Sequence, residues 1–478
     1  MIKKEDIPFY LFFFIPLFFS CNNGNKNENN PPDTSIIVDE INLTGDNRLK
    51  SEVTLNWFGT DKDGYVTAYE FSFDKKNWKK TRKTDSTFLF TITSGSNTQD
   101  VDFWVRSIDN DQDKDPNPDH LKIPIKNTPP DANFISDQMP FDTVNSAVTL
   151  SWKLSDVDGQ DNLKTAFIKV NNGSWYEVDI NESVLTLTPE SPSVAGTQKA
   201  NVYYETNAPE AEKMEGLNVG DTNIFYIKAE DRANSESKVD TSKSIYIKKK
   251  SGDLLLVGAD KNSNVDSYYK NTLDNVYSNN YDFVDFEKNN GERQPKFWNQ
   301  NFFLQISLYD KLVFYSGQNT TTGEGELIIE AAVSSLQRYF DNNGKALITT
   351  SFPGSFNNNS NVFQRLPMDS ISSSEGQARL HSDSTLYAQF PGEHPDLDAS
   401  DFVLDLKPFY PTADADVIYK TPPIKKNGWT GPENMAARRK KNGNTVQVFF
   451  SMKLYKLQGN GTANDNFFDR ILNNEFNW

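Results

Sequence analysis

Short runs of alternating apolar and polar residues dominate the first half of the chain. Residues 53–57 and 166–170 place every second side chain on one face, which is the pattern of a half-buried strand. Segments rich in Gly, Asn, Asp and Pro separate such runs. Alternation at this spacing predicts two antiparallel β-sandwiches, over residues 34–128 and 129–250.

An internal repeat links the two predicted sandwiches. The sequence of residues 55–57, followed by 61–64, recurs at 150–152, followed by 156–159. The offset of about 95 residues is a domain-sized period, longer than the repeats of solenoid proteins. Both copies resemble fibronectin type III and related immunoglobulin-like domains. The resemblance implies that Trp57 and Trp152 are core tryptophans on an early strand.

Two further features divide this half of the chain. Pro129 and Pro130 stand at the joint between the repeats, where a rigid, extended connection is expected. The second repeat carries extra sequence at about 188–220 that is rich in Pro, Glu and Ala. We expect this insertion to form a long loop.

The pattern changes after residue 251. Residues 253–259 form a continuous apolar run, typical of a strand buried on both faces of a parallel sheet. Further strands are predicted at 281–286, 311–317, 345–351 and 445–451, and helices at 266–279, 324–342 and 464–476. Alternation of strands and helices predicts an α/β open parallel-sheet domain over 252–478. This order resembles a class I glutamine amidotransferase-like or flavodoxin-like domain, so the expected fold class is multidomain: two all-β sandwiches followed by α/β.

The amino-terminal residues 1–21 have the layout of an export signal. Lys3 and Lys4 precede an apolar run at 7–19, and Ser20 and Cys21 follow it. The run is too short to span a bilayer comfortably. A small residue before Cys21, the single cysteine of the chain, resembles the lipobox of bacterial lipoproteins. That resemblance implies a lipid on Cys21, a membrane anchor and a place in the cell envelope, at the outer membrane.

Composition and charge limit the kinds of molecule that the protein is expected to bind. Residues 22–33 are polar and predict a flexible tether. A formal net charge of −17 disfavours nucleic acid, whose phosphates require a basic face. The basic cluster at 438–441 precedes Asn442 and Gly443, and we expect it to be a solvated helix end. One cysteine excludes an internal disulfide.

The amidotransferase resemblance also specifies where catalysis would occur. In that family a cysteine follows a central strand, and a His and a Glu lie near a late strand. Here Ser351 follows the strand at 345–351, and the late strand has no histidine. His381 and His394 are the histidines that a Ser-based site would need, with Glu393 or Asp396 as the orienting carboxylate. We therefore expect no enzyme activity from this domain.

Two other kinds of site are suggested by residue type. Asp109, Asp111, Asp113 and Asp115 alternate along one loop and predict a Ca²⁺ ligand set. The alternative is that these residues cap their own turns. Trp298 and Trp429, in polar surroundings, are candidates for stacking against a glycan.

These features predict a non-catalytic envelope lipoprotein that acts as a binding or assembly module in glycan capture or secretion, with a glycan or an envelope protein as partner. The alternatives are a hydrolase or amidotransferase acting through the α/β domain, and a structural spacer. The motifs at 85–87, 142–144, 369–371 and 383–385 resemble O-glycan acceptor sites of exported Bacteroidetes proteins. They agree with the expected location in the cell envelope.

Overall fold

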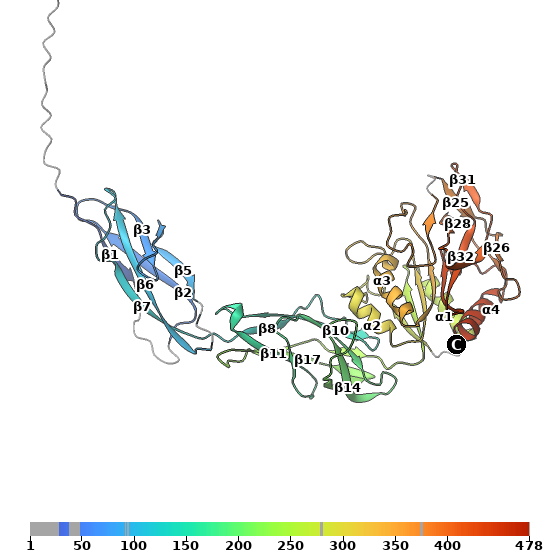
Figure 1. Cartoon of the computed structure of the whole chain (residues 1–478), viewed down its shortest axis with the longest axis horizontal. Coiled ribbons are helices and arrows are strands. Elements are labelled where there is room, and N and C mark those ends of the chain that lie inside the picture. Colours follow the sequence, from blue (N-terminus) through green and yellow to red (C-terminus); the bar gives the residue numbers. More distant parts are fainter. Residues whose placement is uncertain are drawn as a thin grey trace, which may run out of the picture. The chain divides into compact units, whose positions relative to one another are not determined.

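The computed structural model describes residues 28–37, 48–90, 92, 95–277, 281–372 and 376–477. The predicted lipidation site, Cys21, lies outside the described residues. The chain divides between Thr128 and Pro129 into two compact units, drawn in Figure 1. Within the described residues, every helix is too short or too polar to cross a membrane.

The first unit is a β-sandwich. Its strands are β1 (Asp33–Ile37), β2 (Glu52–Thr60), β3 (Val66–Ser72), β4 (Lys79–Thr81), β5 (Asp85–Leu89), β6 (Thr98–Asp109) and β7 (Asp119–Lys126). Among the described residues these strands form one sheet in the order β1-β2-β5 and another in the order β4-β3-β6-β7. The inward faces bury Trp57 against Tyr69, Phe71 and Phe103. The alternation at 53–57 therefore reports a strand with one buried face, as in fibronectin type III-like sandwiches.

A second β-sandwich begins the second unit. Its strands are β8 (Asp131–Phe134), β9 (Thr143–Val144), β10 (Val148–Ser155), β11 (Leu163–Val170), β12 (Tyr176–Val178), β13 (Val184–Pro189), β14 (Gly196–Tyr203), β15 (Met214–Val219), β16 (Asp221–Asn223), β17 (Phe225–Asp231), β18 (Asp240–Thr241) and β19 (Ile245–Ile247). The orders are β15-β14-β13-β10-β8, β12-β11-β17-β18 and β16-β19-β9. Trp152 lies in its core.

The insertion at about 188–220 is not the long loop that its composition predicts. Most of it forms the hairpin β14–β15, which extends the sheet beyond β13. Alternating buried residues such as Ala200 and Val202 carry the hairpin into the core. Burial of one face overrides the weak β-propensity of the Pro, Glu and Ala residues around it.

The rest of the second unit is built on a mixed sheet. Its strands are β20 (Leu254–Ala259), β21 (Tyr281–Asp285), β22 (Lys311–Ser316), β23 (Lys345–Thr350), β26 (Thr385–Ala388), β27 (Leu397–Asp398), β30 (Ala415–Lys420), β32 (Asn434–Lys441) and β33 (Asn444–Phe450). In the described part of the chain the order is β21-β20-β22-β23-β33-β32-β30-β26-β27. The pairings from β21 to β33 are parallel, and those beyond β33 are antiparallel. The sequence pattern predicts a parallel sheet, but only the part from β21 to β33 is parallel.

Helices cover both faces of this sheet. They are α1 (Ser263–Val276), α2 (Phe303–Ile306), α3 (Ile328–Asp341) and α4 (Ala463–Asp469), with the π-helical segments η3 (Trp298–Phe302) and η5 (Arg470–Glu475) and the short turn η4 (Leu454–Lys456). Another short turn, η2 (Gln160–Asn162), lies between β10 and β11 of the second sandwich. Alternate residues of β20 pack on α1 and α4 on one face and on α2 and α3 on the other (Figure 1). The apolar run at 253–259 is continuous because both faces of β20 are buried.

Small strands form a subdomain between β23 and β32. They are β24 (Ser370–Ile371), β25 (Gln377–Leu380), β28 (Val403–Leu406), β29 (Phe409–Tyr410) and β31 (Ile424–Lys426). Strand β28 pairs with β25 and is the end strand of the order β28-β25-β31 in the described residues.

The basic cluster at 438–441 is not a solvated helix end. It belongs to β32, and only 3% of Arg438 is exposed. Four consecutive basic residues predict a solvated surface when only the local sequence is considered. In the structure, β32 pairs with β33, and alternate side chains of a strand point to opposite faces of the sheet, so some of these residues point inward. Arg438 is tolerated inside because acidic partners surround it.

The second sandwich and the α/β part are joined by side-chain contacts within the second unit. Arg338 of α3 donates to the oxygens of Thr206 and Asn207, and its guanidinium lies over the ring of Phe303. Gln300 donates to the carbonyl of Tyr203. The β14–β15 hairpin thus braces the sandwich against α2 and α3.

Candidate ligand-binding crevice

Four parallel strands end side by side and open onto one crevice. Gly258, Tyr315, Thr349 and Phe450 are successive neighbours across β20, β22, β23 and β33. The residues that follow these strands line a cavity of about 470 Å³. The sheet order reverses between β20 and β22, and open sheets bind their ligands in the crevice at such a point.

Short contacts between the strand ends shape the floor of the crevice. The hydroxyls of Ser316 and Thr350 lie 2.6 Å apart, and the amide of Gly317 donates to the carbonyl of Ala259 at 2.9 Å. A Cβ at Gly317 would lie 2.9 Å from Oδ2 of Asp260. Glycine is therefore needed here because the backbone approaches a buried carboxylate.

An ion pair forms the charged part of this floor. Lys453 Nζ lies 2.5 Å from Asp260 Oδ2, and the amide of Asn262 donates to Oδ1 at 3.0 Å. Asp260 is 7% exposed. The pair places a buried acceptor beside a partly exposed donor, and the two charges cancel.

The rim of the crevice is apolar. Phe402, which directly precedes the end strand β28, is 50% exposed, and Leu404, within β28, is 57% exposed. Both side chains line the cavity. Asp405, next along the strand, has a φ of 56°, a conformation that costs about 1–3 kcal/mol for a non-glycine residue and clusters at ligand sites. The crevice therefore combines a polar floor with an apolar rim.

Ser351 lines the crevice, as the amidotransferase resemblance implies for a nucleophile, but it has no base. Its hydroxyl, although buried, has no hydrogen-bond partner in the described structure. The Nδ1 of His381 lies 2.6 Å from Asp383, and its ring packs edge-on against Phe402 at 4.5 Å. His394 contacts Glu475 instead.

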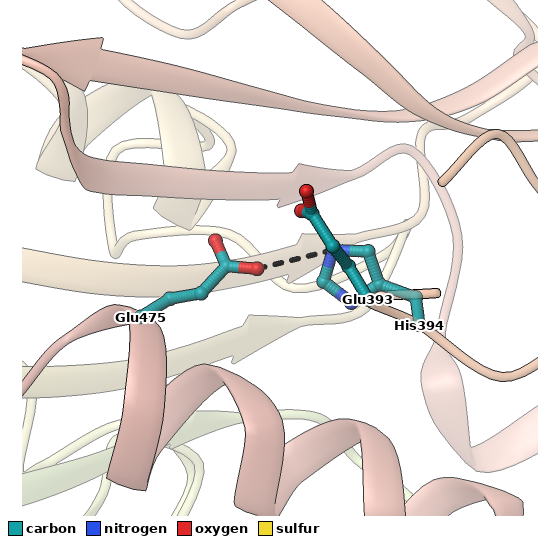
Figure 2. Close-up of side chains that lie close together, drawn as sticks. All are labelled: Glu393, His394 and Glu475. Atoms are coloured by element: carbon teal, nitrogen blue, oxygen red, sulfur yellow. Dashed lines mark ion pairs between the residues drawn. The ribbon is translucent and has the colours of Figure 1, made fainter. Parts of the chain in front are cut away.

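Glu393, His394 and Glu475 form a second cluster (Figure 2), and none of the three lines the crevice. Within the described residues, this is the group of three metal-ligating side chains whose atoms come within 4.8 Å of one another. His394 Nε2 lies 3.1 Å from Glu475 Oε1. Its Nδ1 has no hydrogen-bond partner in the described structure.

The cluster already contains a cation. Arg438 Nη1 lies 2.6 Å from Glu393 and 3.2 Å from Glu475. Burial by itself raises the pKa of Glu475, but hydrogen bonds from His394 and Thr445 and the charge of Arg438 lower it to about 2. A divalent ion would have to compete with the guanidinium for the same oxygens. We therefore interpret the cluster as a buried ion-pair network that holds η5 onto the sheet.

The predicted calcium ligands do not converge on one point. The Nδ2 of Asn29 donates to Asp109 at 2.7 Å and to Asp113 at 2.9 Å, so an amide occupies the space between these carboxylates. Asp111 is exposed, and Asp115 accepts from the amide of Asn117. The loop uses its aspartates largely for turn capping, which the alternation in sequence cannot distinguish from a metal site.

The two candidate tryptophans differ in exposure. Trp429 is 6% exposed and packs in the core, so its ring is not available for the predicted stacking against a glycan. Gly376 approaches its backbone too closely for a side chain. Trp298 is half-buried, edge-on to Phe286 at 5.2 Å, and lines a hollow of about 520 Å³ beside the loop at 321–324.

No family model matches the chain, and no curated protein matches it. Solved structures that resemble it include the fibronectin(III)-like modules of Clostridium thermocellum CbhA, with 10% identity, 45% of this chain and 94% of that chain covered and a TM-score of 0.16. A two-domain fibronectin type III segment of chicken tenascin has 11% identity, 46% and 99% coverage and a TM-score of 0.21. The chicken interferon gamma receptor alpha chain has 10% identity, 46% and 98% coverage and a TM-score of 0.23. These scores carry no functional inference, and the description of the sandwiches rests on their strand pairing.

Sequence reasoning missed Asp260 and Lys453, the charged pair of the crevice. A usable signal exists, because both residues closely follow strongly apolar strands, β20 and β33. Polar residues directly after the buried strands of an open sheet gather at its carboxyl edge. The sequence around Arg438 gives no comparable indication that this side chain is buried.

Proposed function

We propose that the protein is a non-catalytic, envelope-anchored binding protein whose ligand occupies the crevice at the carboxyl ends of β20, β22, β23 and β33. The observation that carries the proposal is a polar crevice in which Ser351 has no base within hydrogen-bond distance. A crevice without a nucleophile–base pair supports binding rather than covalent turnover.

The remaining parts of the chain fit this role. The lipobox resemblance of Cys21 supports an anchor, and the two sandwiches serve as spacers that hold the ligand-binding domain away from the membrane. The proposed setting is the outer membrane of a Bacteroidetes-type bacterium. The third domain is proposed to be an inactive relative of the glutamine amidotransferase-like fold, because its strand order from β21 to β33 is the order of flavodoxin-like sheets.

One observation favours a second candidate, a hydrolase. His381 is oriented by Asp383 and packs against Phe402 at the crevice rim, so a movement of this rim could bring a base toward Ser351. The histidine–carboxylate pair is the orienting half of a triad.

A turnover assay separates the two candidates. Wild type, Ser351→Ala, His381→Ala and His394→Ala are tested for glutaminase, esterase and glycosidase activity, beside a pull-down from the cell envelope. The binding proposal expects no turnover by wild type and a captured partner whose recovery falls with Ser351→Ala. Turnover that Ser351→Ala and His381→Ala both abolish would establish the hydrolase.

A further inference from the structure

We infer that the crevice takes a neutral, polyhydroxylated ligand of the saccharide class, held by the Asp260–Lys453 ion pair and by the hydroxyl of Ser351. The inference rests on the proposed function, because it assigns the ligand of the same crevice. It depends on three features: the internal charge balance, the unpartnered hydroxyl and the apolar rim.

The charge balance argues against a singly charged ligand. Asp260 and Lys453 neutralise each other at 2.5 Å. A ligand anion that captured Lys453 would leave the charge of Asp260 buried without a partner, which is strongly destabilising, and a cation that captured Asp260 would leave the partly exposed Lys453 unpaired. A neutral ligand can donate to Asp260 and accept from Lys453 while the pair stays intact.

Hydroxyl groups suit this floor because each one both donates and accepts. Asp260 only accepts and Lys453 only donates. The buried hydroxyl of Ser351 has no partner in the described structure and can serve in either role. A buried polar atom without a partner costs about 1–3 kcal/mol, so a ligand hydroxyl at this place is favoured.

The rim supplies an apolar surface to the same cavity as the polar floor. Phe402 is 50% exposed beside a cavity of about 470 Å³, a size typical of small-molecule sites. A sugar ring has polar edges and an apolar C–H face, which matches a crevice lined both by hydroxyl partners and by an aromatic ring.

The test measures binding to the full chain in detergent micelles. An array of neutral and acidic glycans selects ligands, and calorimetry gives the Kd for neutral hexose di- and trisaccharides, for glucuronic acid and for free glutamine. We expect a neutral saccharide to bind. Ser351→Ala is expected to raise its Kd about 2–10-fold, and Asp260→Asn about 10–100-fold, the ranges for one neutral and one charged hydrogen bond.

Controls keep the result interpretable. Lys213→Met, which removes an exposed ion pair with Glu190 in the second sandwich, should leave the Kd unchanged. Phe402→Ala removes rim surface together with the ring contact to His381, and it serves as the test if Asp260→Asn unfolds the domain, as judged by circular dichroism. Its Kd should also rise.

The remaining outcomes overturn the inference in distinguishable ways. Binding of glutamine or glucuronic acid in the crevice, without a neutral glycan, would exclude a neutral saccharide as the ligand and keep the proposed function. A folded protein that binds no glycan on the array would also exclude that class. Glycan binding that ignores Ser351→Ala, Asp260→Asn and Phe402→Ala would remove the crevice as the site, and with it the proposed function.

Discussion

At the scale of single residues, buried charged side chains contribute strongly to the stability of the second unit. Arg438 on β32 is 3% exposed and reaches Glu393, Glu475 and Asp416. Each carboxylate is tolerated because the guanidinium offers several fixed donors at once. The stability of the sheet beyond β33 therefore depends on one side chain more than on the many exposed ion pairs.

Arg438→Met is the direct test of that dependence. Removing the cation takes the charge of Arg438 away from the buried Glu475, and we expect a loss of about 3–5 kcal/mol in the free energy of unfolding. Urea denaturation followed by tryptophan fluorescence measures it. The control, Lys440→Met on the same strand, removes a half-exposed lysine 3.8 Å from Asp416 and should cost less than about 1 kcal/mol. Equal effects of the two variants would contradict the buried network.

Asp156, in the loop after β10, makes stability depend on pH in the opposite sense to most carboxylates. Burial and the charges of Asp158, Asp231 and Asp131 raise its pKa from 3.8 to about 6. The folded state therefore binds more protons than the unfolded state between these two values, and this contribution weakens the fold as pH rises through the window. Above about pH 6 the destabilisation is complete.

Asp156→Asn should remove this effect. The variant keeps the oxygen that accepts from the amide of Asp158 and loses the charge, so we expect a higher Tm than wild type at pH 7.5 and a difference close to zero at pH 4. Calorimetry at both pH values measures it. Asp161→Asn, an exposed carboxylate of the same loop, is the control. A Tm gain that persists undiminished at pH 4 would rule out the ionisation mechanism.

At the scale of elements, one hairpin connects the second sandwich to the α/β part of the chain. The β14–β15 hairpin extends the second sandwich, and the chain between these strands receives the Arg338 hydrogen bonds from α3. An insertion that reads as a loop therefore serves as a brace. Its contacts explain why the second sandwich belongs to the same compact unit as the α/β part.

Arg338→Ala should loosen that brace. The hydrogen bonds to Thr206 and Asn207 and the contact with Phe303 are lost together, at a cost of about 1–3 kcal/mol. We expect the second unit to unfold in two calorimetric steps instead of one. Gln337→Ala, which removes a bond within α3, should leave the single transition unchanged. A single transition in Arg338→Ala as well would contradict the bracing role.

At the scale of the whole molecule, the prediction concerns the anchor. If Cys21 carries the lipid, Cys21→Ser should move the protein from the membrane fraction to the soluble fraction, because a diacyl anchor supplies stable membrane affinity that one acyl chain does not. Fractionation followed by immunoblotting measures it, with Ser20→Ala as the control that keeps the cysteine. Membrane recovery of Cys21→Ser at the level of wild type would exclude the lipoprotein proposal.

The sequence by itself determined those features that depend on local pattern. Alternation marked β2 and β11, a continuous apolar run marked β20, and the order of strands and helices placed loops at one edge of the sheet. These predictions were possible because the period of the pattern reports directly how many faces of an element are buried. The same local reading located Ser351 at the end of β23.

Only the tertiary structure decided which distant residues meet. It paired Asp260 with Lys453, surrounded Arg438 with carboxylates, buried Trp429, filled the space between Asp109 and Asp113 with Asn29, and turned the insertion at about 188–220 into strands. The physical reason is that a polar residue is stable inside when its partner is present. That partner is supplied by another part of the chain, and local composition does not report it.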